Sequence, residues 1–202
     1  RILILVTVML STAIAPVRGP VIAQLSNSPS ATTFDVDTFV GPDFVDFWWD
    51  PAEIPGCSTF TISRKTSTST WTEVATPTCG AGFYTDSTVT AGTDYSYYLS
   101  VQDGGEPPTT LFYRYAGATP GTISGMLHRA VSIGGAVTLG GVTLADGGNL
   151  TLSNVTATGG SVNDGQGSVT VSGGTYDGTG FTLANAASSI TGVTLANGTI
   201  ST

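Results

Sequence analysis

A short segment that recurs four times in the last third of the chain decides the fold. It reads Val-Ser-Ile-Gly-Gly at 131–135, Leu-Thr-Leu-Ser-Asn at 150–154, Val-Thr-Val-Ser-Gly at 169–173 and Ile-Thr-Gly at 190–192. The first residues of these segments are 19, 19 and 21 positions apart. A period of about 20 residues is typical of a β-solenoid, in which each turn buries its apolar side chains only against its neighbours. The sequence therefore predicts a stack of short turns over residues 126–202.

Within each turn, apolar and polar residues alternate before a corner. Alternate side chains of a strand point to the same face, so the valine, leucine and isoleucine residues are expected inside the stack. Corners are expected at Asp146-Gly147, at the Asn-Asp-Gly segment 163–165 and at Asp177-Gly178, because glycine adopts the positive φ angles of tight turns. In this pattern of alternating residues and glycine-containing corners, the segment resembles the right-handed parallel β-helix repeats of bacterial surface proteins and polysaccharide-degrading enzymes.

The preceding segment, residues 24–118, carries strand signals separated by turns. Alternating or aromatic-rich runs lie at 45–49, 60–64, 71–74, 83–86 and 95–99. Short strands with turn signals about every 8–12 residues predict a β-sandwich. From about residue 30 to 118 the segment resembles a fibronectin type III domain, because Trp48 or Trp49 takes the place of the family's core tryptophan and the turn that ends at Tyr95 matches its tyrosine corner. The resemblance implies a spacer or a binding module.

Composition divides the chain into two domains. Residues from Thr119 onward hold 18 of the 27 glycines but only two of the 18 aromatic residues. We therefore predict an all-β protein made of a fibronectin type III-like β-sandwich at 24–118, a linker at 119–125 and a short β-solenoid at 126–202.

The charge balance argues against a nucleic-acid partner. Only 10% of the residues are charged, the net charge is −8, and no lysine or arginine follows Arg129. Such a chain has no basic patch that could neutralise phosphates. Its low charge and its many threonine, serine and glycine residues are typical of secreted β-proteins, outside the cell or at its surface. In a host that glycosylates, three sequons would be candidate acceptor sites: Asn149, Asn154 and Asn197.

The N-terminal segment, residues 1–23, fits a secretory signal peptide. Arg1 is followed by an apolar run and by small residues that would permit cleavage after Ala23. The run is rich in β-branched residues, which favours a strand if the segment is retained, and a membrane-anchoring helix is the third alternative. A retained strand would complete the sheet of a neighbouring subunit. The candidate assembly residues are Ile2, Ile4, Val6, Val8 and Leu10.

Cys57 and Cys79 are the only cysteines, and both lie in the sandwich segment. In a secreted protein an isolated pair is expected to form a disulfide, although the fibronectin type III pattern has none. Two buried free thiols are the alternative.

No convincing catalytic centre is evident. His128, the only histidine, has no nucleophile motif around it and is interpreted as a surface or interface residue. Asp146 and Asp164 follow their turn anchors by 15 and 14 residues. Stacked turns about 4.8 Å apart would bring the two carboxylates close enough for a Ca²⁺ ion or a glycosidase pair. Both aspartates lie in Asp-Gly-type turns, where a structural role for the carboxylate is the alternative to Ca²⁺ binding or catalysis. Ca²⁺ is the only cofactor that the sequence suggests.

These observations favour a non-catalytic extracellular structural protein, a subunit of a self-assembling surface filament or an adhesin. The solenoid stops at Thr202 in mid-turn without a polar cap, and an open sheet end pairs readily with another chain. A homo-oligomer or filament is therefore expected, unless the chain is a fragment. The alternative is a carbohydrate-binding or carbohydrate-processing module, a fragment of a larger secreted β-helix enzyme, with glycans as partners.

Overall fold

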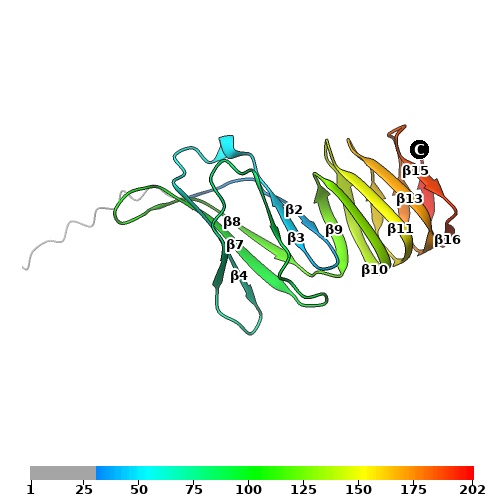
Figure 1. Ribbon diagram of the computed structural model, residues 1–202, viewed down its shortest axis with the longest axis horizontal. Helices are drawn as coiled ribbons and strands as arrows, with labels where there is room; N and C mark the ends of the chain where they lie inside the picture. The colour runs from blue at the N-terminus through cyan, green and yellow to red at the C-terminus, as the bar shows by residue number, and fades with distance from the viewer. Residues whose placement is uncertain (1–30) are drawn as a thin grey trace, which may run out of the picture.

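The computed structural model describes residues 31–202, so the predicted signal peptide and assembly strand at 1–23 lie outside the described residues. Figure 1 shows a β-sandwich followed, along the long axis of the molecule, by a stack of turns that carries the C-terminus. The predicted all-β class is confirmed, because the one helical element within 31–202 is a single 3-10 turn, η1 (Pro51–Glu53). None of the helical structure in this range is long and apolar enough to cross a membrane.

Two sheets form the sandwich. The first has the spatial order β1 (Thr32–Thr33), β8 (Thr110–Ala118), β7 (Tyr95–Gln102), β4 (Thr59–Thr66) and β5 (Thr72–Ala75). The second has the order β2 (Asp37–Val40), β3 (Val45–Trp48) and β6 (Phe83–Asp86). All neighbours within the sandwich are antiparallel except β1, which runs parallel to β8.

The core of the sandwich contains the tryptophan expected from the fibronectin type III resemblance. Trp49 is 6% exposed and packs edge-on against Phe60, with ring centroids 4.5 Å apart. Its neighbour Trp48 is only half-buried and contributes no side chain to this core. Trp49 is therefore the core residue of the two. The tyrosine corner is also present, because the hydroxyl of Tyr95 accepts a hydrogen bond from the backbone N–H of Thr90 at 3.1 Å.

A buried charge network ties the two sheets together at Asp86, which is fully buried. Its carboxylate accepts hydrogen bonds from Arg64 at 2.6 Å, from the hydroxyl of Thr88 at 2.7 Å and from that of Tyr97 at 2.8 Å. Burial alone would raise the pKa of Asp86, but the bonds from Thr88 and Tyr97 and the charge of Arg64 outweigh burial and lower it. Burial, with the bond to Asp86, raises the pKa of Tyr97.

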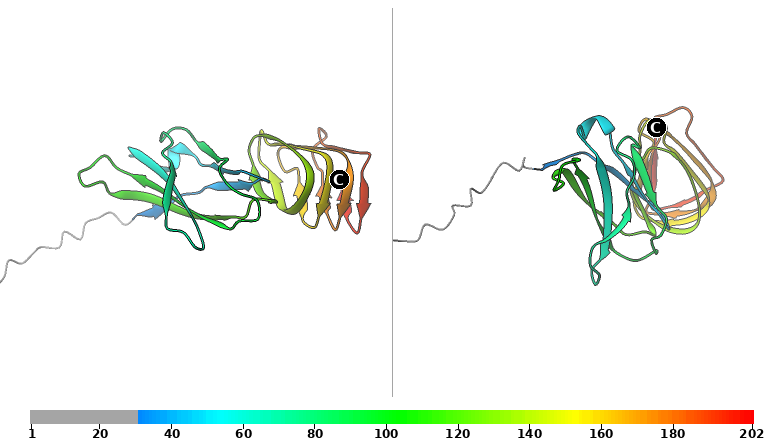
Figure 2. Two further views of the ribbon diagram at one scale, coloured as in Figure 1. Left: turned by 60° about the horizontal axis from the view of Figure 1, so that its bottom comes forward. Right: turned by 60° about the vertical axis from the view of Figure 1, so that its left-hand side comes forward.

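The solenoid is built from parallel strands stacked in two ladders, seen edge-on in Figure 2. The first ladder contains β9 (Thr122–Leu127), β10 (Ala130–Leu144), β11 (Asn149–Thr158), β13 (Ser168–Asp177), β15 (Ser189–Thr191) and β16 (Thr194–Ala196). The second continues from the end of β10 through β12 (Ser161–Asn163), β14 (Gly180–Thr182) and β17 (Thr199–Ser201). The predicted β-solenoid is therefore confirmed.

One column of the solenoid is more regular than the sequence pattern suggested. Ile133 pairs with Leu152, Leu152 with Val171 and Val171 with Ile190, so each step is 19 residues. The 21-residue spacing expected for the last turn is wrong, because it aligned Ile190 with the first apolar residue of the preceding segment and not with the third. These apolar residues form a continuous column inside the stack.

The sandwich and the solenoid share a sheet. The predicted linker at 119–125 is largely strand, since β9 pairs antiparallel with β2 and parallel with β10. Gly125 makes this contact possible: its φ is +100°, and a Cβ atom there would collide with the carbonyl oxygen of Thr38. The second sheet of the sandwich therefore runs without interruption into the solenoid.

Charged side chains reinforce this shared sheet. The guanidinium of Arg129 donates to both carboxylate oxygens of Asp46, at 2.8 Å and 3.3 Å, and lies 5.0 Å from the ring centre of Phe44. Asp46 is 1% exposed, and it also accepts a hydrogen bond from the hydroxyl of Thr85 at 2.6 Å. The buried carboxylate therefore has partners from both halves of the molecule.

Candidate functional site

Four aromatic rings gather on the outside of the sandwich, on the sheet that contains β4, β7 and β8. On β7 the side chains of Tyr97 and Leu99 are buried between the sheets, so Tyr98 between them points outward. Tyr115 lies directly opposite Tyr98 on β8, and Tyr113 follows two residues away on the same side. Trp71, just before β5, completes the group. We call Trp71, Tyr98, Tyr113 and Tyr115 the aromatic face.

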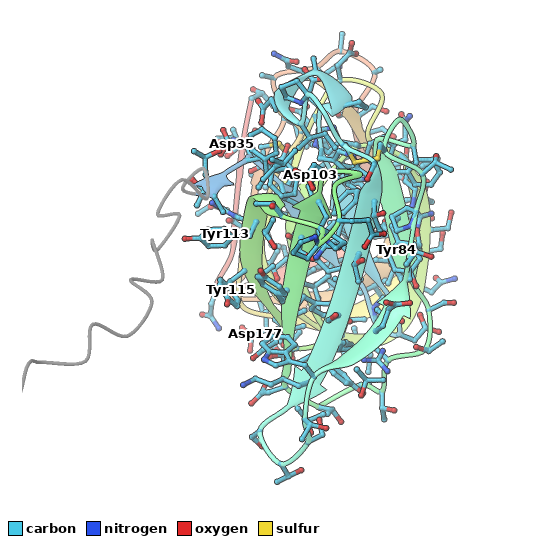
Figure 3. All side chains as sticks on the ribbon, turned by 90° about the vertical axis from the view of Figure 1, so that its left-hand side faces the viewer. Asp35, Tyr84, Asp103, Tyr113, Tyr115 and Asp177 are labelled. Atoms are coloured by element: carbon cyan, nitrogen blue, oxygen red, sulfur yellow. A yellow bond between two sulfur atoms is a disulfide. The ribbon has the colours of Figure 1, made fainter. Side chains whose placement is uncertain are left out.

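The four rings are in contact with one another. The Tyr98 and Tyr115 centroids are 4.9 Å apart at the centre of the group. Tyr113 lies 6.4 Å from Tyr98 and 6.0 Å from Tyr115 on one side, and Trp71 lies 6.1 Å and 6.3 Å from the same two rings. Figure 3 shows Tyr113 and Tyr115 beside each other on the outer surface of the sandwich. The rings therefore form one continuous surface and not four isolated residues.

This surface is open to solvent. Tyr115 is 61% exposed and Trp71 is 41% exposed, whereas Tyr98 and Tyr113 are half-buried beneath their neighbours. Single exposed apolar residues are ordinary in soluble proteins, but a contiguous exposed group marks an interaction surface. Because the four side chains point away from the other sheet, they contribute nothing to the sandwich core.

Few charges surround the aromatic face. The ammonium group of Lys65 lies 4.8 Å from the ring centre of Trp71, and exposed Glu73 is paired across the sheet with Ser63. Burial, followed by the neighbouring Tyr115 and Tyr113, raises the pKa of Tyr98, so its hydroxyl stays neutral well above neutral pH. The aromatic face therefore offers apolar ring faces and neutral hydroxyls.

The strands around the rings add further hydroxyl groups. Ser63 lies opposite Tyr98 on β4 and exposed Ser96 lies opposite Lys65, whereas Ser100, opposite Tyr113 on β8, is buried. Aromatic faces pack favourably against C–H groups, while hydroxyls at the ring edges and on adjacent strands donate and accept hydrogen bonds. This combination suits a ligand with apolar C–H faces and polar edges, which is the character of a sugar ring.

A second candidate region, a cleft, lies where the sandwich meets the solenoid. A cleft of about 310 Å³ is lined by two tryptophans, one histidine and four acidic residues: Asp35, Asp37, Trp48, Trp49, Asp50, Glu53 and His128. Three of the carboxylates already have partners. Asp37 contacts His128 at 2.8 Å, Asp50 accepts from the N–H of Ala52 at 2.8 Å, and Glu53 accepts from the N–H of Asp35 at 3.0 Å.

The same cleft explains the position of His128. Its ring stacks on Trp48 with centroids 5.2 Å apart, and the other side of Trp48 stacks on Phe83 at 5.1 Å. The structure therefore places the histidine at the interface between the two halves of the molecule, held by Asp37 and Trp48. Over residues 31–202, no cluster of three or more histidine, cysteine or acidic side chains is arranged to hold a metal ion.

Asp164 has a structural role in the solenoid. Its buried carboxylate accepts hydrogen bonds from the N–H groups of Ala184 and Asn185, at 3.0 Å and 2.8 Å, and from the hydroxyl of Ser188 at 2.8 Å. Burial would raise the pKa of Asp164, but these bonds lower it. The carboxylate therefore anchors the corner of the next turn, and its oxygens are already engaged.

Asp146 does not stand at the equivalent corner. Asn149 pairs with Ser168, so counting back three residues aligns Asp146 with Gly165 and not with Asp164. The two aspartates are only 18 residues apart, whereas the step is 20 residues from β10 to β12 and 19 residues from β11 to β13, so they are out of register. The carboxylate pair considered for Ca²⁺ or for catalysis is therefore replaced by one buried anchor and one exposed corner residue.

The three sequon asparagines lie on exposed parts of the solenoid. Asn154 and Asn197 both have positive φ angles of 51°, and the side-chain amide of Asn197 donates to Asp177 at 2.9 Å. Asn149 donates to the carbonyl oxygen of Gly147 at 3.1 Å. All three therefore serve corners of the stack, and their glycosylation stays a prediction.

The predicted disulfide is present, since the sulfur atoms of Cys57 and Cys79 are bonded. It links the segment after η1 to the segment between β5 and β6. The disulfide lies in the sandwich and does not contribute to the aromatic face.

Sequence reasoning missed the aromatic face, although part of the signal was visible. Tyr113 and Tyr115 alternate on one strand, which indicates a shared face. Their contacts with Tyr98 and Trp71 depend on the pairing of β4, β5, β7 and β8, and the sequence alone does not fix that register.

No protein-family model and no curated protein matches the chain. Among solved structures, it is similar to the Fn3-like protein from Clostridium thermocellum, with 22% identity and a TM-score of 0.32 over 44% of this chain and 94% of that one. It is also similar to pectate lyase PelI from Erwinia chrysanthemi in complex with tetragalacturonic acid, with 14% identity and a TM-score of 0.35 over 85% of this chain and 78% of that one. Pectate lyase Pel3 from Pectobacterium carotovorum gives 14% identity and a TM-score of 0.35 over 76% and 60%.

These comparisons correct one expectation. We expected a protein that is not an enzyme, because the sequence carries no convincing catalytic motif. The PelI and Pel3 structures, which align with most of the chain, are pectate lyases and therefore enzymes, so that expectation is contradicted. At these identities the likeness concerns the fold, and it assigns no catalytic residue to this chain.

Proposed function

We propose that the chain is a carbohydrate-binding or carbohydrate-processing module of a secreted β-helix protein, and that the aromatic face binds the glycan. The observation that carries this proposal is the contact of four solvent-facing rings, surrounded by hydroxyl groups, on one side of a sheet. Sugar rings present C–H groups on their faces and hydroxyls at their edges, which is complementary to this surface.

A secreted location is part of the proposal. The Cys57–Cys79 disulfide supports it, because disulfides persist in oxidising compartments. We rank carbohydrate binding above the self-assembling filament subunit or adhesin. The aromatic face supports this order, because it is a defined surface for a ligand.

The first prediction tests the aromatic face by removing its two most exposed rings. Trp71→Ala and Tyr115→Ala should each weaken glycan binding about 2-fold to 10-fold, since aromatic contacts contribute about 0.5–1.5 kcal/mol beyond buried area. Binding is measured by affinity electrophoresis in gels that contain soluble polysaccharides and by sedimentation with insoluble ones.

Phe83→Ala is the matched control. Phe83 is 49% exposed but lies on β6, on the other sheet of the sandwich. Binding that falls equally in Phe83→Ala, or that is unchanged in the Trp71→Ala, Tyr115→Ala double variant, would show that the aromatic face is not the site. Circular dichroism of each variant verifies that the sheets are intact.

A further inference from the structure

We infer that the aromatic face selects an uncharged, extended polysaccharide and discriminates against polyuronates. This inference rests on the proposed function, because it names the class of glycan that the same surface would take. Three properties carry it: the charges beside the rings, the charge of the whole chain and the open arrangement of the rings across the sheet.

The charges beside the rings cannot select an acidic sugar. Lys65 is the one cation that lies over the aromatic face within residues 31–202, and its ammonium is 4.8 Å from the Trp71 ring centre. Glu73 lies one strand away, opposite Ser63, and adds a negative charge to the same sheet. Recognition of a carboxylate favours a guanidinium fork, but Arg64 on β4 donates to buried Asp86. Arg114 lies between Tyr113 and Tyr115 on β8 and therefore on the opposite side of that strand.

The charge of the whole chain also opposes a polyanion. The sequence has 14 acidic residues, six lysine or arginine residues and a net charge of −8. At low ionic strength, repulsion of this kind acts over tens of ångströms and lowers the rate at which a like-charged polymer reaches the surface. An uncharged polysaccharide experiences no such penalty.

The shape of the aromatic face favours the interior of a chain over its end. The rings lie across β8, β7 and the start of β5 on an open sheet surface, with Tyr113 at one side and Trp71 at the other. The ring planes are inclined to one another by 35° to 73°, so separate rings can contact successive sugars of an extended chain, whereas recognition of a chain end needs an enclosing pocket. Pyranose rings with equatorial hydroxyls suit the aromatic face best, because their axial C–H groups cover both ring faces.

The test measures binding of the intact chain to two soluble polymers: hydroxyethylcellulose, which is neutral and β-linked, and polygalacturonate, which is a polyuronate. Salt is varied from about 0.01 M to about 1 M, over which the Debye length falls from about 30 Å to about 3 Å. We expect hydroxyethylcellulose to bind with an affinity that changes less than about 2-fold over this range, and polygalacturonate not to bind at low salt.

Two substitutions, one beside the rings and one of a ring, make the test sharper. Lys65→Gln should leave the affinity for hydroxyethylcellulose within about 3-fold of the parent chain, because it removes one cation–π contact but no ring. Trp71→Ala should reduce the same affinity further. Glucose alone should compete poorly, since it occupies only part of the aromatic face.

The outcomes separate this inference from the proposed function. Polygalacturonate binding that weakens steeply with salt and is lost in Lys65→Gln would overturn the inference while leaving carbohydrate binding in place. If neither polymer binds and no other glycan is retained, the proposed function itself fails. Binding of hydroxyethylcellulose that depends on Trp71 and Tyr115 but not on salt supports both.

Discussion

At the residue scale, the protein shows how a buried charge is retained in a small β-sandwich. Asp86 is fully buried, and three side chains, Arg64, Thr88 and Tyr97, donate to its carboxylate. None of these four residues belongs to the aromatic face or lines the cleft between the sandwich and the solenoid. We therefore assign it to stability and expect it to govern the behaviour of the protein in acid.

Asp86→Asn should destabilise the protein by about 3 kcal/mol at neutral pH, because removing one partner of a buried ion pair leaves the other uncompensated. The folded-state pKa of Asp86 is lowered, so its contribution is fully present above the unfolded pKa of about 3.9 and is lost as pH falls through the folded value. The difference between parent and variant should therefore shrink below about pH 4. Urea unfolding at several pH values measures it.

Asp164 also has a lowered pKa and so contributes to acid sensitivity in the same direction. Comparison of the parent with Asp86→Asn at each pH removes this common contribution. A difference in unfolding free energy that is as large at pH 3 as at pH 7 would mean that shape, and not charge, accounts for the effect.

At the element scale, the sequence predicted the strands better than their connections. The alternating runs at 60–64 and 95–99 and the turn repeats identified real strands, because periodicity reports which side chains face the core. The linker at 119–125 was expected from glycine and proline, but pairing with β2 and β10 turns most of it into β9. Strand pairing between distant segments therefore outweighed local composition at 119–125. Strand pairing also brings Trp71 next to Tyr98, which the local sequence does not indicate.

Gly125 provides a test of that pairing. Gly125→Ala should destabilise the protein by about 2–4 kcal/mol, because alanine resists a φ of +100° and its Cβ would collide with the carbonyl of Thr38. Gly117→Ala on β8 is the matched control, since a Cβ atom there has no neighbour within 4 Å. Equal unfolding free energies for the two variants would contradict the close approach of β9 to β2.

At the scale of the whole molecule, the continuous sheet makes the sandwich a cap for one end of the solenoid. β9 pairs with the edge of β10 on one side and with β2 on the other, so both edges of β9 are paired at this end of the solenoid. Unpaired sheet edges promote aggregation, and solenoids need a different structure at their ends. The arrangement also fixes the aromatic face relative to the axis of the turns, because the two units share hydrogen-bonded strands and the Arg129–Asp46 ion pair.

The last prediction concerns that ion pair as the link between the two halves. Arg129→Met should reduce the unfolding free energy by about 2–4 kcal/mol, because Asp46 is 1% exposed and would keep its charge with only the Thr85 hydroxyl as a side-chain partner. Adding Asp46→Asn to Arg129→Met should restore part of the loss, since the uncompensated charge is then removed. Arg114→Met is the control, because Arg114 forms no ion pair within residues 31–202. If the double variant is as unstable as the sum of the two single variants, the two side chains do not act as a pair and the shared strands alone hold the halves together.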